Sequence, residues 1–222
     1  MSFTRKLAAE FIGTAGLLTI VVGSGIMGER LSGGNAAVAL LGNSFATGAG
    51  LIILIYGLSN ISGAHFNPVV TLTETFDGKI GRMDSFRYLV AQFAGAIFGV
   101  IVANLMFELN AVNFSTKTRA GGAQFLGEFV ATFGLIGVIR LGAAFHPKLV
   151  GAMVACYIIA AYWFTSSTSF ANPAVTVARS LSNTFAGIAP SSIPMFIVAQ
   201  FAGGIAAMFV FKWLLAEKET DE

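Results

Sequence analysis

Two Asn-Pro motifs, Asn67-Pro68-Val69 and Asn172-Pro173-Ala174, are the residues of this chain whose types and spacing most clearly indicate chemistry. Asparagine is favoured just before a helix, and proline suits the first helical position because its missing N–H would be unpaired there. Each motif therefore predicts the N-terminus of a helix, which carries about half a positive charge. The chemistry available there is hydrogen-bond donation by the amides, combined with repulsion of cations.

Four further polar residues recur in pairs within apolar segments: Glu10 with Glu128, and Gln92 with Gln200. An ionisable residue in such a segment is a functional candidate by default, for example as a proton carrier in a transporter. The chain has two histidines and one cysteine, too few for a multi-ligand metal site or a Cys-His nucleophile pair. It contains no HExxH or GxSxG motif, so we expect neither an enzyme nor a bound metal or cofactor.

The composition is typical of a membrane protein. Hydrophobic residues make up 55% of the 222 residues and charged residues only 11%, whereas soluble domains carry roughly 25% charged residues. This shortage argues against a soluble enzyme and a disordered chain. The single cysteine argues against a disulfide framework, and a net charge of +2 gives no basic stripe for nucleic acid. The remaining class is an integral membrane protein whose main partner is the lipid bilayer.

Six stretches are apolar enough to cross a bilayer core of about 30 Å, which needs about 20 helical residues. Helices are expected because backbone polar groups in lipid must be paired within the segment. The stretches run roughly over 7–27, 36–58, 86–107, 124–144, 148–165 and 193–215.

The distribution of basic residues predicts the orientation. An even number of spans leaves both termini on one side, and the positive-inside rule places the more basic side in the cytoplasm. That side would hold Arg5, Lys6, Lys79, Arg82, Arg87, Arg140, Lys148, Lys212 and Lys218, and the opposite side Arg30, Lys117, Arg119 and Arg179. We therefore expect a multi-pass protein of the cell membrane, plasma or inner, with both termini cytoplasmic.

The chain contains an internal repeat. The segment Val90–Gly95 recurs letter for letter as Val198–Gly203, and the Glu-Phe pair at 10–11 matches the pair at 128–129. The two Asn-Pro motifs match each other in the same order. The halves are expected at 1–110 and 111–222, each with three spans. Because an odd number of spans reverses direction, the second half is inverted relative to the first, which places a binding or conducting site near the bilayer midplane.

Two moderately apolar segments, 67–76 and 172–182, remain as half-helices of about 15 Å, or half a bilayer. A single Asn-Pro motif could be a surface turn, but two at matching places in inverted halves favour re-entrant half-helices whose N-termini meet. The predicted fold class is therefore an all-α membrane protein with six transmembrane helices and two re-entrant half-helices in an inverted repeat.

The residues that lead into each proline cannot be helical, so their carbonyls must line a wet cavity. These are Gly63, Ala64, His65 and Phe66 in the first half, and Thr168, Ser169 and Phe170 in the second. A file of acceptors interrupted by amide donors, inside an apolar tube, suits a small neutral solute that can both donate and accept.

The whole chain resembles the aquaporin and glycerol-facilitator family, also called the major intrinsic proteins. The segment Ser62–Thr71 is similar to the first motif region of that family and Phe170–Ala174 to the second. The resemblance implies passive flow through a homotetramer with one pore per subunit. It also implies that Glu10 and Glu128 brace the re-entrant loops by accepting backbone N–H bonds, with Gln92 and Gln200 as similar supports. The symmetric placement of the glutamates favours bracing over proton coupling in an ion-coupled secondary transporter.

The chain departs from the family after the second motif. Most members continue with arginine, which narrows and charges the outer constriction, whereas this chain has Val175. The next arginine, Arg179, lies one helical turn further on, and we do not assign it the selectivity role. Spacing relative to the family places the constriction at Thr47, Ala160, Ser169 and Val175, which are all small and uncharged. This predicts a wide, neutral constriction that passes water, glycerol, urea and neutral metalloid hydroxides such as arsenite. The alternative is a strictly water-selective channel in which Phe45, Tyr162 or Phe170 fills the gap.

Overall fold

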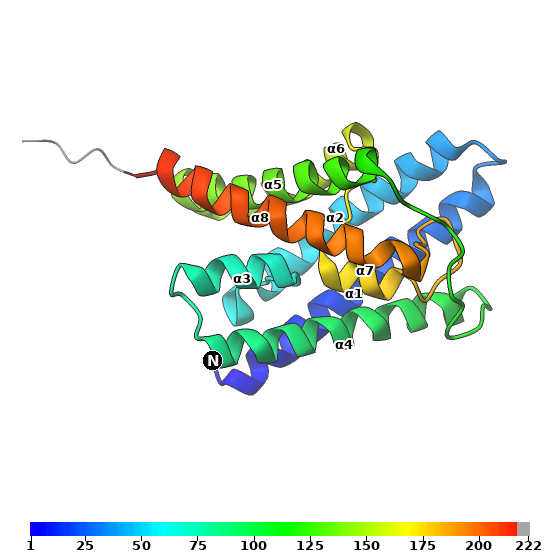
Figure 1. Cartoon of the computed structure of the whole chain (residues 1–222). Coiled ribbons are helices and arrows are strands. Elements are labelled where there is room, and N and C mark those ends of the chain that lie inside the picture. The colour runs from blue at the N-terminus through cyan, green and yellow to red at the C-terminus, as the bar shows by residue number, and fades with distance from the viewer. Residues whose placement is uncertain (217–222) are drawn as a thin grey trace, which may run out of the picture.

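The computed structural model describes residues 1–216 and is helical almost throughout (Figure 1). The long helices are α1 (Phe3–Leu31), α2 (Ala36–Ser62), α4 (Arg82–Met106), α5 (Gly122–Phe145), α6 (Val150–Phe164) and α8 (Ile193–Leu214). The short helices are α3 (Pro68–Phe76) and α7 (Pro173–Arg179), with 3-10 turns at Pro147–Leu149 and Pro190–Ser192. Within the described residues, six helices are long and apolar enough to cross a membrane, as the sequence predicts. Lys218 lies outside the described residues.

Several helices extend beyond the predicted spans. Helix α1 begins at Phe3 and reaches Leu31, and α2 continues to Ser62. Helix α2 stops there because Gly63, at a φ of 90°, adopts the left-handed conformation that closes a helix and donates its N–H to the carbonyl of Ser59. Helix α6 starts two residues later than predicted, after the 3-10 turn that begins at Pro147.

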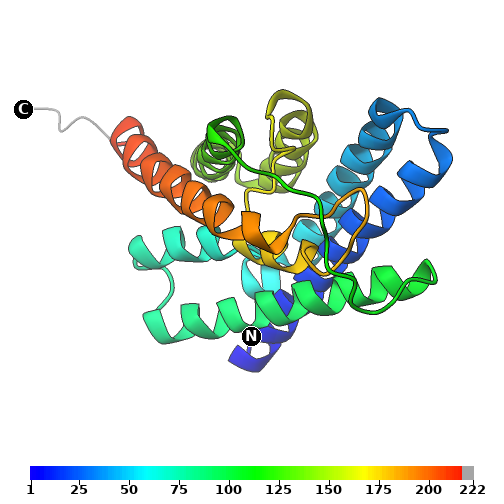
Figure 2. The ribbon, with the colours of Figure 1, turned by 45° about the vertical axis from the view of Figure 1, so that its right-hand side comes forward.

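The long helices surround the two short ones. Helix α1 packs along α4 and α2, and α5 packs along α8 and α6. Figures 1 and 2 show α3 and α7 between these two groups, with α7 near the middle of the bundle and α3 toward the left-hand end of Figure 1. The repeated glycines allow close helix crossings, since a Cβ on Gly95 would overlap with the backbone of Phe11 and one on Gly203 with the backbone of Phe129. The repeated sequence thus builds the same helix crossing in each half.

The two half-helices differ in length. Helix α3 agrees with the predicted 67–76, with Asn67 as its N-cap. The prediction of 172–182 is wrong at its C-terminal end, because α7 stops at Arg179. The carbonyls of Ser180 and Leu181 instead accept the N–H groups of Ser115 and Asn113, both at 2.9 Å. This pairing draws the chain out of the helix and attaches it to the connection between α4 and α5.

Val69, in the first turn of α3, packs directly against Gly204 of α8. Val69 is 1% exposed, and a Cβ on Gly204 would overlap with its side chain. We expect Gly204→Ala to destabilise the protein by about 1–3 kcal/mol through overpacking, and Val69→Ala in the same chain to restore much of the loss. Thermal unfolding of the detergent-solubilised protein measures the effect. Gly57→Ala is the control, because no atom of the described part of the chain lies within 4 Å of a Cβ there. Equal melting temperatures for Gly204→Ala and Gly57→Ala would contradict this prediction.

Candidate functional site

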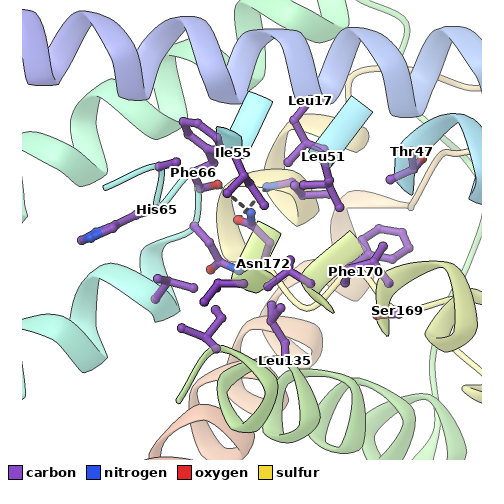
Figure 3. A pocket seen from close by; sticks show the side chains of 18 of the residues that line it. Leu17, Thr47, Leu51, Ile55, His65, Phe66, Leu135, Ser169, Phe170 and Asn172 are labelled. Atoms are coloured by element: carbon purple, nitrogen blue, oxygen red, sulfur yellow. Dashed lines mark hydrogen bonds between the residues drawn. The ribbon is translucent and has the colours of Figure 1, made fainter. Parts of the chain in front are cut away.

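The two asparagines cap their own half-helices and bond to the opposite half of the chain. The Asn67 side-chain oxygen accepts the N–H of Val69 at 2.9 Å, while its Nδ2 donates to the carbonyl of Ala171 at 2.8 Å. The Asn172 side-chain oxygen accepts the N–H of Ala174 at 3.0 Å, and its Nδ2 donates to the carbonyl of Phe66 at 2.8 Å (Figure 3). Each side-chain amide therefore donates one of its two N–H groups to the opposite half of the chain, and its second N–H remains available to bind a solute.

The loops before the half-helices adopt a backbone conformation that is unusual for residues with side chains. Ala64 and Phe66 have φ values of 53° and 48°, and Thr168, Ser169 and Ala171 have values of 60°, 49° and 49°. The left-handed region costs about 1–2 kcal/mol per non-glycine residue, so neighbouring contacts must hold the loops in place.

Glu10 supplies those contacts in the first half. It is fully buried in α1. One carboxylate oxygen accepts the N–H of His65 at 3.0 Å and the hydroxyl of Ser62 at 2.7 Å. The other accepts the N–H of Phe66 and the Nε2 of Gln92, both at 2.8 Å. The carboxylate thus collects four donors, two of them from the strained loop.

Glu128 makes the corresponding contacts in the second half. It is also fully buried, in α5. Its two oxygens accept the N–H groups of Phe170 and Ala171, both at 2.9 Å. Gln200 donates to the same carboxylate and to the Thr176 hydroxyl, as Gln92 does to Glu10 and Thr71. The paired Glu and Gln residues of the sequence therefore lie at matching contacts.

A cavity of about 290 Å³ passes the point where the half-helices meet. Its polar strip includes Gly63, Ala64, His65, Phe66, Asn67, Ser169, Phe170 and Asn172. Apolar side chains from the long helices form the rest of the wall, among them Leu17, Leu51, Ile55 and Leu135 (Figure 3). Thr168 does not line it, and neither do Pro68, Val69, Pro173 and Ala174, which are buried in the first turns of α3 and α7. The arrangement is a tube with one hydrogen-bonding side.

Three of the four expected constriction residues line this cavity at the end beside α7, which we call the α7 end. Thr47, Ser169 and Val175 are buried there, and the Thr47 hydroxyl lies 3.3 Å from the Tyr162 hydroxyl. Ala160 is exposed on the outside of α6, so its expected place in the constriction is wrong. Two residues rotate a helix by about 200°, so Ala160 faces outward when Tyr162, which lines the cavity, faces inward.

The lining at the α7 end also includes a charged side chain, which the predicted set of small, uncharged residues does not contain. Arg179 is only 2% exposed, borders the cavity, and donates its Nε–H to the carbonyl of Ala186. Its guanidinium carbon lies 3.5 Å from the centre of the Phe170 ring. The sequence shows an arginine one helical turn beyond Val175. Its position against Phe170 depends on tertiary contacts, which residue spacing does not reveal.

A second arginine approaches the same ring from the connection between α4 and α5. Arg119 lies 5.0 Å from the centre of Phe170 and donates to the carbonyls of Gly187 at 3.0 Å and Ser167 at 3.2 Å. Burial, together with the nearby charges of Arg119 and Arg179, lowers the pKa of Lys117 in that connection. This end of the cavity is therefore electropositive.

The opposite end of the cavity, beside α3, carries charges of both signs. Glu74 and Lys79 border it and form an ion pair at 3.1 Å. Asp77 nearby pairs with Arg140 at 2.7 Å, which links α3 to α5. Within residues 1–216, no group of three His, Cys, Asp or Glu side chains converges in a way that could hold a metal ion.

The chain is similar in sequence to known proteins along nearly its whole length. Residues 1–162 match the model of the major intrinsic protein family. The chain is similar to the aquaglyceroporin AqpS of Rhizobium meliloti, with 49% identity over 96% of this chain and 91% of that protein. It is also 30% identical to aquaporin NIP1-4 of Oryza sativa, over 95% of this chain and 78% of that protein.

A solved structure supports the fold. The aquaglyceroporin of Plasmodium falciparum superposes with a TM-score of 0.72 over 96% of this chain and 98% of that one, at 21% identity. Six membrane-length helices, two capped half-helices and these sequence matches lead to one assignment. The chain belongs to the major intrinsic protein family.

Proposed function

We propose that the protein is a passive transmembrane channel for water and small uncharged solutes, including glycerol. The observation that carries this proposal is the cavity with one hydrogen-bonding strip and an otherwise apolar wall, centred on the two crossed asparagines. A solute leaves bulk water only if hydrogen bonds replace those it loses. Carbonyl acceptors along the strip and the remaining amide N–H groups offer that replacement to water and hydroxyl-bearing molecules.

The same proposal assigns roles to the site residues. Asn67 and Asn172 orient the solute at the centre, while Glu10, Glu128, Gln92 and Gln200 hold the loops that present the carbonyls. Thr47, Ser169 and Val175 shape the constriction together with Tyr162. The small side chain of Val175 supports passage of urea and of neutral metalloid hydroxides such as arsenite.

We also propose the membrane in which the channel lies, its orientation and its oligomeric state. We place the channel in the cell membrane, plasma or inner, with both termini cytoplasmic, so that the α7 end opens outward. The protein acts as a homotetramer with one pore per subunit. The halves 1–110 and 111–222 contribute one half-helix each.

A plug in the cavity tests the conducting path. Leu51 of α2 is 7% exposed and lines the cavity, whereas Ile53, two residues on, is 72% exposed on the outside of the helix. We expect Leu51→Trp to reduce water and glycerol flux into liposomes to the level of empty vesicles, because the indole fills the tube. Ile53→Trp adds the same ring outside and should keep wild-type flux.

The assay compares water, glycerol, urea and arsenite side by side, by light scattering and by arsenic content. Val154→Trp, which enters the cavity from α6, provides a second plug. Full flux in both folded plug variants would refute this path. Flux of water alone would favour the strictly water-selective alternative. Saturable flux that collapses when a protonophore is added would favour an ion-coupled secondary transporter.

A further inference from the structure

Arg179 has an unusual combination of burial and free hydrogen-bonding capacity. Its side chain is 2% exposed, yet only its Nε donates to the protein, to Ala186. Within residues 1–216, its Nη1 and Nη2 groups have no hydrogen-bond partner, and no carboxylate forms an ion pair with it. Four N–H groups of a buried cation therefore remain available beside the cavity.

Such a group needs a partner outside the protein. A buried charge is strongly unfavourable unless hydrogen bonds replace its lost hydration. The cavity is the open space that Arg179 borders. Water or solute inside the cavity must supply the missing acceptors, so the guanidinium interacts with whatever passes.

The packing around Arg179 keeps its plane fixed. The guanidinium lies on the face of Phe170, and Phe170 meets Phe196 edge-on with ring centres 5.1 Å apart. Arg119 approaches the same ring and is held by two backbone carbonyls, those of Ser167 and Gly187. A planar cation stacked on an aromatic ring loses little freedom when it binds an oxygen atom.

The helix geometry explains how Arg179 reaches this place. Residues four apart lie on the same face of a helix, and side chains point toward its N-terminus. Arg179 therefore extends back over Val175, whose short side chain leaves the space open. Both residues border the cavity, as this geometry requires.

We propose that Arg179 is the specificity-determining residue of the α7 end, where its free N–H groups bind the oxygen atoms of uncharged solutes and its charge excludes cations. Arg119 is a positioning residue that holds Phe170, the surface on which the guanidinium rests. The inference depends on the proposed channel function and specifies the solutes that this channel selects, which are neutral molecules bearing hydroxyl oxygens.

Neutral replacements of Arg179 test the proposal. Arg179→Met keeps an apolar stem against Phe170, and Arg179→Gln keeps a donor for the Ala186 carbonyl. Water permeability and elution volume show which variants are folded and conducting. We expect both variants to admit potassium ions and protons about tenfold faster than wild type, or more, because a unit charge a few ångströms from the path is lost. We also expect glycerol to lose its advantage over urea. Arg179→Lys keeps the charge and should still exclude cations.

Moving the arginine by one turn provides the matched control. The double variant Val175→Arg/Arg179→Met places a guanidinium beside the cavity again, now on the preceding turn of α7. We expect it to exclude cations as the wild type does. The proposal is overturned if Arg179→Met or Arg179→Gln conducts water at the wild-type rate and still excludes cations and ranks solutes as the wild type does. One such variant is enough. Absence of water flux in the wild-type protein would instead refute the proposed function itself.

Discussion

Glu128→Ala is expected to leave almost no protein that is both folded and conducting. The change removes the acceptor of the Phe170 and Ala171 N–H groups and of Gln200. Each unsatisfied buried donor costs about 1–3 kcal/mol, and the strain of Ser169 and Ala171 is then no longer offset. The combined loss is a large fraction of a typical folding free energy of about 5–15 kcal/mol. Elution profile, thermal unfolding in detergent and water flux in liposomes measure it.

Two comparisons make the Glu128 result specific. Glu29→Ala removes an exposed glutamate and should change neither stability nor flux. Glu128→Gln keeps the shape but loses one acceptor oxygen, so we expect an intermediate loss of stability, and the same series at Glu10 should behave alike. If Glu128→Gln were as stable as wild type but lost a proton-dependent component of flux, proton coupling would explain this residue better than bracing does.

Asn172→Asp is expected to admit cations to the proposed channel. An aspartate still accepts the N–H groups that cap α7, but it has no Nδ2 to donate to Phe66. Its carboxylate would place a negative charge where two helix N-termini now repel cations. We expect measurable proton and potassium entry into liposomes, together with reduced stability from the unpaired Phe66 carbonyl. A pH-sensitive dye inside the vesicles follows the proton leak.

The chain offers a matched control for this change. Asn35 caps α2 in the same way, accepting the N–H groups of Ala37 and Val38. It is exposed, however, and within residues 1–216 its side chain makes no hydrogen bond to another segment. Asn35→Asp should therefore keep stability and selectivity, since aspartate is as good a cap. Asn67→Asp should reproduce the leak from the other half. Tight vesicles with folded Asn172→Asp and Asn67→Asp would show that the asparagines do not govern cation exclusion.

The sequence predicted the features that depend on local pattern. The motif at Asn67 defined the start of α3 because capping and proline preferences act within one helical turn. The repeated segment Val90–Gly95 indicated two related halves, and the structure then placed the same helix crossing at both copies. Hydrophobic length was enough to find the membrane helices, although Gly63 had to be read as a cap to place the end of α2.

What the sequence missed depends on contacts between distant segments. Ala160 was assigned to the constriction by counting residues back from Asn172. The residue of α6 that lines the cavity is Tyr162, and the error of two positions placed the prediction on the outer face of the helix. Helix α7 ended early because its chain pairs with Asn113, which no local preference encodes. The position of Arg179 was missed because it depends on Phe170 and Ala186, neither of which adjoins it in the helix.

The crossed asparagine bonds also set the order in which the protein can be completed. The carbonyl that accepts from Asn67 belongs to Ala171, which lies 104 residues later in the chain. At a synthesis rate of about 5–20 residues per second, the first loop therefore waits roughly 5–20 s for its acceptor. During that interval the amide must bond to water or to the insertion machinery. The central site can therefore form only after the three long helices of the first half, α1, α2 and α4, have been synthesised.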